Sequence, residues 1–252
     1  AAYTNFHYLR DVWRRTTEKD ALLGLGMTGI GSGKVQGLDL EEAAKLAVDT
    51  NKYYANELGI NSAARVTTVK PSGTTSCVLG TSSGVHAWHN DYYIRRIRVG
   101  KNEAIYTYLQ LNHPELVEDD FFKPETQAVI SIPQKAEEGG ILRHETSIEL
   151  LDRVKDIYQR WIANGHVAGN NTHNVSCTVS VKEDEWDLVG RWMWDNKEFY
   201  NGLSVLPYFA ADSTYTQLPF EDIDETQFTE LVSTLKEVDV SQVVELIDNT
   251  DL

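Results

Sequence analysis

The spacing of apolar residues predicts amphipathic helices, and the clearest covers residues 147–163. Apolar side chains recur there every three or four positions and therefore share one face. Thr146 and Glu149 form a capping-box pattern at its start, and Gly165 follows its end. The predicted inward face consists of Ile148, Leu151, Val154, Ile157, Tyr158, Trp161 and Ile162.

A second helix is predicted over residues 40–58. Asp39, with Glu42 three residues later, is a typical N-terminal cap, and Gly59 is a typical stop. We expect the apolar side of this helix to carry Ala43, Ala47 and Tyr54. Further helices are predicted over residues 8–19, 103–111, 184–196 and 226–236.

Short runs rich in valine, isoleucine and threonine separate these helices and predict strands. Strands that alternate with helices indicate a largely parallel sheet covered by helices. We therefore expect one α/β unit over residues 1–252, with residues 221–252 as a C-terminal helical extension. The predicted strands are residues 65–69, 128–132, 174–181 and 203–206.

Composition excludes several classes of protein. The 252 residues include 23 Lys+Arg and 38 Asp+Glu, so the formal charge is −15, which disfavours a nucleic-acid coat or an anionic-membrane binder. No apolar run approaches the roughly 18 residues that cross a bilayer. Two cysteines are too few for a disulfide framework or a cysteine-rich zinc site.

The Gly-rich segment 29–34 resembles a phosphate-binding P-loop but fails on spacing. Thr28 stands where the pattern requires the first glycine, and Val35 follows Lys34 where it requires serine or threonine. The segment is therefore predicted to be a flexible connecting loop. A P-loop NTPase remains a third, disfavoured hypothesis.

A stronger candidate for binding an anion follows the predicted strand 65–69. Four hydroxyl side chains and one glycine lie within five residues, at a strand-to-helix turn where backbone N–H groups bind phosphate-type anions. An ordinary Ser/Thr turn is the alternative interpretation. The predicted phosphate-binding residues are Pro71, Ser72, Gly73, Thr74, Thr75 and Ser76, with Lys70 as a neighbouring positive charge.

Three arginines form a local cluster of positive charge in an otherwise acidic chain. In the extended run 94–99, Arg96 and Arg98 share one face and Arg95 lies on the other. They either neutralise a bound phosphate or form salt bridges with the acidic surface, and salt bridges are slightly favoured for any single arginine. His86 and His89 lack a third ligand at useful spacing, so no metal site is predicted.

Several separated strings, in order along the chain, resemble the C-terminal half of the adenosylcobalamin-dependent (class II) ribonucleotide reductases, most closely the monomeric ribonucleoside-triphosphate reductases. The main strings are VKPSGT at 69–74, GVH at 84–86 and YYIRRIR at 92–98. Supporting strings are GLGMTG at 24–29, HNVS at 173–176, VKEDEW at 181–186, GLSVLPY at 202–208 and YTQLPF at 215–220.

The resemblance implies the second half of a ten-stranded α/β barrel, with mostly parallel strands and covering helices. It implies a cytoplasmic oxidoreductase of deoxyribonucleotide biosynthesis that converts ribonucleoside triphosphates, or diphosphates, to 2′-deoxyribonucleotides by thiyl-radical chemistry. The cofactor would be adenosylcobalamin, and an external dithiol such as thioredoxin would reduce the enzyme. The turn at 71–76 would bind the substrate phosphates.

The chain departs from this family in its thiols. Cys77 and Cys177 do not lie in the Asn-x-Cys-x-Glu string of the radical cysteine, and the redox cysteine pairs are missing. The resemblance therefore implies no catalytic residue in this chain and a partner N-terminal half that carries the radical cysteine. The alternative is a stand-alone anion- or nucleotide-binding module without redox activity.

Overall fold

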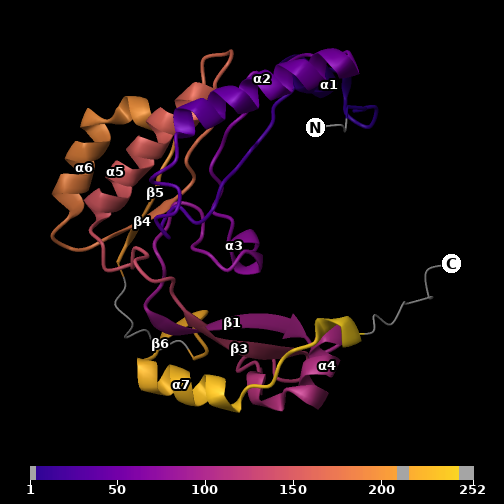
Figure 1. Ribbon diagram of the computed structural model, residues 1–252, viewed down its shortest axis with the longest axis vertical. Coiled ribbons are helices and arrows are strands. Elements are labelled where there is room, and N and C mark those ends of the chain that lie inside the picture. Colours follow the sequence, from indigo (N-terminus) through magenta and orange to yellow (C-terminus); the bar gives the residue numbers. More distant parts are fainter. Residues whose placement is uncertain (1–3, 209–215, 244–252) are drawn as a thin grey trace. The chain divides into compact units, whose positions relative to one another are not determined.

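The computed structural model of the chain describes residues 4–208 and 216–243, and the chain divides into two units (Figure 1). Unit 1 comprises residues 1–88 and 137–210, and unit 2 comprises residues 89–136 and 211–252. The sequence predicted one unit over residues 1–252. A second unit forms because residues 92–135 pair among themselves into a separate sheet with its own apolar cluster.

The helices of unit 1 lie where the apolar spacing predicted them. The longest predicted helix continues from α5 through a π-helical turn at Tyr158–Ile162 and a 3-10 turn at Ala163–Gly165. The capping box of Thr146 and Glu149 is confirmed, because each side chain bonds the backbone N–H of the other. The α-helices of unit 1 are α1 (Asp11–Asp20), α2 (Leu40–Leu58), α3 (Thr75–Val78), α5 (Ser147–Ile157) and α6 (Trp186–Asp195), and a 3-10 turn follows at Lys197–Phe199.

Helix α2 begins and ends as predicted but turns a different face inward. Asp39 accepts a hydrogen bond from the Glu42 N–H at 2.9 Å, and Gly59 ends the helix with a φ of 65°. The buried residues are Leu40, Ala44, Val48 and Ala55, whereas Ala43 and Tyr54 are exposed. The predicted face was one position out of register, which rotates a helix by about 100°.

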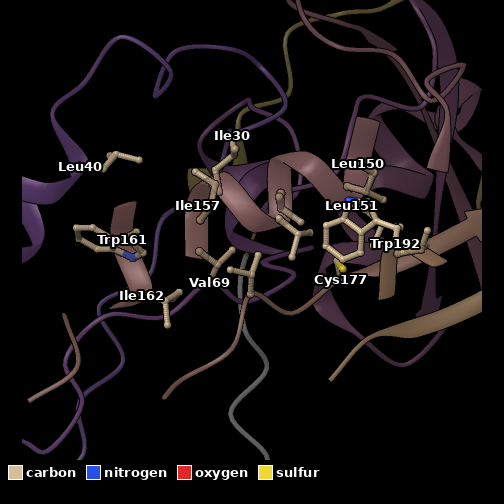
Figure 2. Packing of buried hydrophobic residues seen from close by; sticks show 14 of the residues in the cluster. Ile30, Leu40, Val69, Leu150, Leu151, Ile157, Trp161, Ile162, Cys177 and Trp192 are labelled. Carbon is tan, nitrogen blue, oxygen red and sulfur yellow. The ribbon is translucent and has the colours of Figure 1, made fainter. Parts of the chain in front are cut away.

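The core of unit 1 packs α5 and its π-helical turn against α6 and two short strands (Figure 2). Leu151 and Val154 are fully buried, as is Val179 on the strand beneath them. The strands β4 (Thr178–Val181) and β5 (Ser204–Pro207) pair in parallel, as the sequence predicted for the sheet. Exposed and buried residues alternate along β4, so one face of the strand packs against this core.

Unit 2 contains an antiparallel sheet, which the sequence did not predict. Its strands are β1 (Tyr92–Gly100), β2 (Val117–Asp119), β3 (Gln127–Lys135) and β6 (Phe220–Asp222), in the order β2-β3-β1-β6. All three strand pairs are antiparallel. The connection between β2 and β3, residues 120–126, is too short for the helical crossover that a parallel pair needs. The expectation of mostly parallel strands is therefore wrong for this unit.

The remaining elements of unit 2 are helical. They are α4 (Ala104–Asn112), α7 (Glu225–Thr234) and 3-10 turns at Pro114–Leu116 and Val240–Gln242. The predicted C-terminal extension, residues 221–252, thus holds α7 but begins within β6, and residues 244–252 lie outside the described residues. Within the described part of the chain, no helix has both the length and the apolar composition that crossing a bilayer requires.

Candidate functional site

The predicted phosphate turn starts at the end of an extended segment, residues 65–69, in the middle of unit 1. This segment bonds to residues 23–25 on one side, where the Leu25 N–H donates to the Val66 carbonyl at 2.9 Å. On the other side, the Ser176 N–H donates to the Val69 carbonyl at 2.9 Å. Both neighbours are parallel to it, so the carboxyl ends of all three segments meet at one edge. Ligands of open α/β sheets bind outside this edge.

The turn itself has a constrained backbone. Ser72 has a φ of 55°, in the left-handed region that non-glycine residues avoid. Its hydroxyl donates to the Lys70 carbonyl at 3.2 Å, and its own carbonyl accepts the Ser76 N–H at 2.9 Å. Helix α3 then begins at Thr75. A strained residue of this kind costs about 1–3 kcal/mol and persists only where the surrounding structure holds it.

The four hydroxyls of the turn differ in exposure. Thr74 and Thr75 are exposed, and Ser72 is half-buried. Ser76 is buried, and its hydroxyl donates to the Gly73 carbonyl at 3.3 Å. Thr74 and Thr75 therefore carry the exposed hydroxyls of the turn, whereas the hydroxyls of Ser72 and Ser76 bond to carbonyls within it. Pro71 and Gly73 are also exposed, and so is Lys70 at the start of the turn.

A second loop, residues 81–86, supports the turn from behind. The Ser83 hydroxyl donates to the Pro71 carbonyl at 2.5 Å. Gly84 has a φ of 58°, and a Cβ at this position would lie 2.5 Å from the Lys70 carbonyl oxygen and 3.0 Å from that of Pro71. Only glycine allows this approach, because it has neither the steric penalty at positive φ nor the side chain.

The Gly-rich segment that failed the P-loop pattern holds this supporting loop in place. The Gly29 N–H donates to the Ser82 carbonyl at 2.9 Å, and the Ile30 N–H donates to the Gly84 carbonyl at 3.0 Å. Ile30 is fully buried. The prediction of a flexible connection is wrong, because the segment is packed against residues 81–86. Lys34 forms an ion pair with Glu137.

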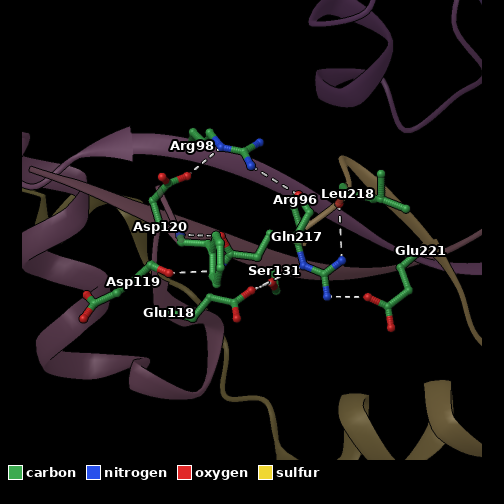
Figure 3. Close-up of polar contacts among 10 residues, drawn as sticks. Arg96, Arg98, Glu118, Asp119, Asp120, Ser131, Gln217, Leu218 and Glu221 are labelled. Atoms are coloured by element: carbon green, nitrogen blue, oxygen red, sulfur yellow. Dashed lines mark hydrogen bonds and ion pairs between the residues drawn. The ribbon is translucent and has the colours of Figure 1, made fainter. Parts of the chain in front are cut away.

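The three arginines lie on β1 of unit 2, and the predicted division of their faces is confirmed. Arg96 forms ion pairs with Glu118, at 3.3 Å, and with Glu221 (Figure 3). Arg98 Nε lies 2.7 Å from a carboxylate oxygen of Asp120, which is 2% exposed. The hydrogen bond from Arg98 holds the pKa of Asp120 below its usual range.

Arg95 is directed elsewhere, with its guanidinium 5.4 Å from the centre of the Phe220 ring. The geometry of Arg96 and Arg98 therefore matches the salt-bridge interpretation. The phosphate turn, by contrast, belongs to unit 1.

One of the two cysteines is buried and the other is exposed. Burial raises the pKa of Cys177 to about 11, so its thiol is protonated in the core near physiological pH. Cys77 is exposed on α3, and its S–H donates to the Gly73 carbonyl at 2.9 Å. Among the described residues, no cluster of three or more His, Cys, Asp or Glu side chains is arranged to hold a metal ion.

Sequence reasoning missed the supporting residues of the turn. Ser83 and Gly84 contact it across a gap of more than ten residues in sequence, and Thr28 reaches the same loop from still farther away. Gly84 lies in the GVH string at 84–86 and Thr28 in the GLGMTG string at 24–29; both strings carried the family resemblance without indicating a role, and Ser83 lies in neither.

Comparison with known proteins finds ribonucleoside-triphosphate reductases among the relatives of this chain. No family model matches the chain. It is 31% identical over 209 residues to a probable adenosylcobalamin-dependent ribonucleoside-triphosphate reductase of Dictyostelium discoideum, covering 79% of this chain and 25% of the relative. It is 28% identical to an adenosylcobalamin-dependent ribonucleoside-triphosphate reductase of Lactobacillus delbrueckii subsp. bulgaricus, covering 84% of this chain and 29% of the relative.

The fold is similar to a crystal structure of a B12-dependent (class II) ribonucleotide reductase. The TM-score is 0.72 at 21% sequence identity, over 88% of this chain and 34% of that chain. The chain thus spans about a quarter to a third of the length of these three proteins. The α/β fold that the sequence resemblance implied is confirmed.

Proposed function

We propose that this chain, a relative of the adenosylcobalamin-dependent (class II) ribonucleotide reductases, supplies the substrate-phosphate site of such an enzyme. The enzyme would convert ribonucleoside triphosphates, or diphosphates, to 2′-deoxyribonucleotides. The chain would contribute part of the second half of the catalytic barrel. The observation that carries this proposal is the constrained turn at residues 70–76, exposed at the carboxyl edge of three parallel segments.

The turn is suited to bind phosphate through neutral donors. Gly73, Thr74 and Thr75 are exposed, and Ser72 is half-buried with its hydroxyl on the Lys70 carbonyl. Each hydrogen bond to a charged oxygen contributes about 1.5–3 kcal/mol. The net charge of −15 opposes an anion only over short range, because salt screens charges beyond roughly 10 Å. A few bonds of this kind therefore outweigh the repulsion.

The shape of the turn is fixed before any ligand binds. The positive φ of Ser72 and the bond from Ser83 to Pro71 hold the backbone in a conformation that a free peptide avoids. Binding to a preorganised site does not carry the entropic cost of ordering the site. In the complete enzyme, this would place the ribose of the substrate at a fixed distance from the reacting thiol.

The radical chemistry would come from outside this chain. Adenosylcobalamin, when bound, would supply the radical that activates a cysteine thiol. Neither cysteine here fits that role, because Cys177 is buried in the core and Cys77 lies outside the expected string. We therefore assign the radical cysteine to an N-terminal partner half and re-reduction to an external dithiol such as thioredoxin. This chain would bind and orient the substrate.

Reconstitution tests this proposal. The purified chain would be mixed with a matching N-terminal half, adenosylcobalamin, a dithiol and a ribonucleoside triphosphate or diphosphate. We expect deoxynucleotide product only from the complete mixture. A verified complex of the two halves that forms no product would count against the proposal.

In the same assay, Thr74→Ala is expected to raise the KM for the nucleotide roughly ten- to hundredfold, the equivalent of one lost charged hydrogen bond. Ser72→Ala is expected to raise the KM as well, because the Ser72 hydroxyl holds the turn through the Lys70 carbonyl. The matched control is Ser233→Ala, which removes an exposed hydroxyl from α7. Unchanged kinetics for both turn variants would show that the phosphate assignment is wrong.

A second candidate is a stand-alone anion- or nucleotide-binding module without redox activity. It is favoured by one observation: the turn and the loops that support it all lie in unit 1. Calorimetry distinguishes the two functions, because micromolar affinity for a nucleotide without any partner half would support the module.

A further inference from the structure

We propose that His86 is the positioning residue of the phosphate turn, and that it holds the turn in its binding shape only while its imidazole is uncharged. This inference rests on the proposed phosphate site and adds a control to it. His86 belongs to the GVH string, to which the proposed function gives no role.

The hydrogen bonds of His86 determine its protonation. Its Nδ1 lies 3.0 Å from the Ser83 carbonyl oxygen, which only accepts, so Nδ1 carries the hydrogen. Its Nε2 lies 3.0 Å from the backbone N–H of Thr178, which only donates, so Nε2 must offer a lone pair. Only the neutral imidazole with hydrogen on Nδ1 satisfies both partners.

These two bonds connect a strand of the core to the back of the turn. Thr178 is the first residue of β4. Ser83, at the other end of the imidazole, donates its hydroxyl to the Pro71 carbonyl, and its neighbour Gly84 lies against the Lys70 carbonyl. One path from β4 to the turn thus runs through the His86 side chain.

The loop is also attached by other bonds, which bring charged groups near the imidazole. Arg153 on α5 donates to the Val85 carbonyl at 2.9 Å and pairs with Glu145 through two contacts of 2.7 and 2.8 Å. The cavity beside His86, about 110 Å³, is also lined by Arg143 and Tyr208. Cys177, which precedes Thr178 along the chain, is protonated.

This environment keeps the imidazole neutral near physiological pH. Burial lowers the pKa of His86 most strongly, and the Arg153 guanidinium lowers it further. The backbone hydrogen bond with Ser83 and the Glu145 carboxylate raise it only in part. The pKa therefore lies below the ordinary value of about 6.5.

Protonation would remove the acceptor that Thr178 needs. With hydrogen on both nitrogens, the imidazolium N–H at Nε2 would face the Thr178 N–H, and two donors repel. The loop would separate from β4, and Ser83 would no longer fix Pro71. Phosphate affinity is therefore expected to be complete above the ordinary histidine pKa and to be lost as the pH falls through the lowered pKa of His86.

Solution NMR of the chain tests this inference without any ligand. The ¹⁵N shifts of the His86 ring should report hydrogen on Nδ1 near pH 7.5. The amide resonances of Ser72 and Thr74 should titrate together with that ring. They should not do so in His86→Gln, because glutamine offers a donor and an acceptor but does not titrate. His7→Gln, at an exposed histidine, is the matched control.

Binding of inorganic pyrophosphate provides the second readout. From about pH 7.5 to about one pH unit below the His86 pKa that the NMR titration measures, the affinity of the natural chain should fall roughly tenfold more than that of His86→Gln. The comparison removes the protonation of pyrophosphate itself, which is common to both. If pyrophosphate does not bind at the turn at all, the proposed function fails, and the NMR titration still decides the role of His86. Turn amides that do not titrate with His86, or equal pH profiles for the two chains, would overturn the inference.

Discussion

Gly84→Ala is expected to weaken the binding of inorganic pyrophosphate to this chain by at least about a hundredfold. A Cβ at this position would lie 2.5 Å from the Lys70 carbonyl oxygen and 3.0 Å from that of Pro71. Both atoms belong to the backbone of the turn and cannot rotate away, so the turn itself must move. Displacing it by enough to lose two charged hydrogen bonds removes about 3 kcal/mol or more of binding free energy. Calorimetric titration of the folded variant measures the effect.

Gly80→Ala is the matched control for this substitution. Gly80 has a φ of 60°, close to the 58° of Gly84, but a Cβ there meets no heavy atom within 4 Å. A side chain at positive φ therefore destabilises both variants by about 1–2 kcal/mol, and only Gly84→Ala also displaces the turn. Equal losses of affinity in the two variants would mean that backbone strain, and not contact with residues 70 and 71, explains the effect.

Trp161→Ala is expected to lower the free energy of unfolding of unit 1 by about 3–5 kcal/mol. Trp161 is 6% exposed within the apolar core of this unit. Its indole N–H donates to the Thr68 carbonyl at 3.1 Å, so the substitution also leaves a buried acceptor without this donor. Urea denaturation followed by circular dichroism measures the loss.

Trp194→Ala provides the comparison, because Trp194 is 71% exposed on α6. This substitution removes a tryptophan side chain from the surface and is expected to lower the free energy of unfolding by well under about 1 kcal/mol. A similar loss in both variants would contradict the core described for unit 1. The Thr68 bond also predicts that Trp161→Ala disturbs the extended segment 65–69, which leads into the phosphate turn.

The sequence predicted the elements whose signals are local. Thr146 with Glu149 sets the start of α5, Asp39 with Glu42 sets the start of α2 and Gly59 sets its end, because each cap depends on residues close together in sequence. Which residues of α2 face inward was predicted less well. Tyr54 is exposed and Ala55 is buried, because packing partners rather than periodicity select among similar faces.

The periodicity of apolar residues could not predict which distant segments pair with each other. The antiparallel sheet of unit 2 brings β6 beside β1 over more than a hundred residues, and no local signal specifies that partner. Contacts between distant segments could not be predicted for the candidate site either. The position of the phosphate turn followed from its hydroxyls and its strand, whereas Ser83, Gly84 and His86 act on it through contacts that only the fold creates.

The arginines of β1 illustrate how the fold decides between two interpretations. Alternation along the strand predicted that Arg96 and Arg98 share a face, and they do. The sequence could not specify their partners, because Glu118 and Asp120 come from a neighbouring segment and Glu221 from β6. The two charges are therefore matched by carboxylates within unit 2.

The most direct measurement of the central claim is an NMR titration of the ¹⁵N-labelled chain with a ribonucleoside triphosphate. NMR detects binding even at millimolar Kd, so a chain that spans only part of its relatives can be tested by itself. We expect saturable shifts concentrated at the amides of residues 72–75, with smaller shifts at Ser83 and Gly84. Saturable shifts located elsewhere, with the amides of the turn unmoved, would contradict the account.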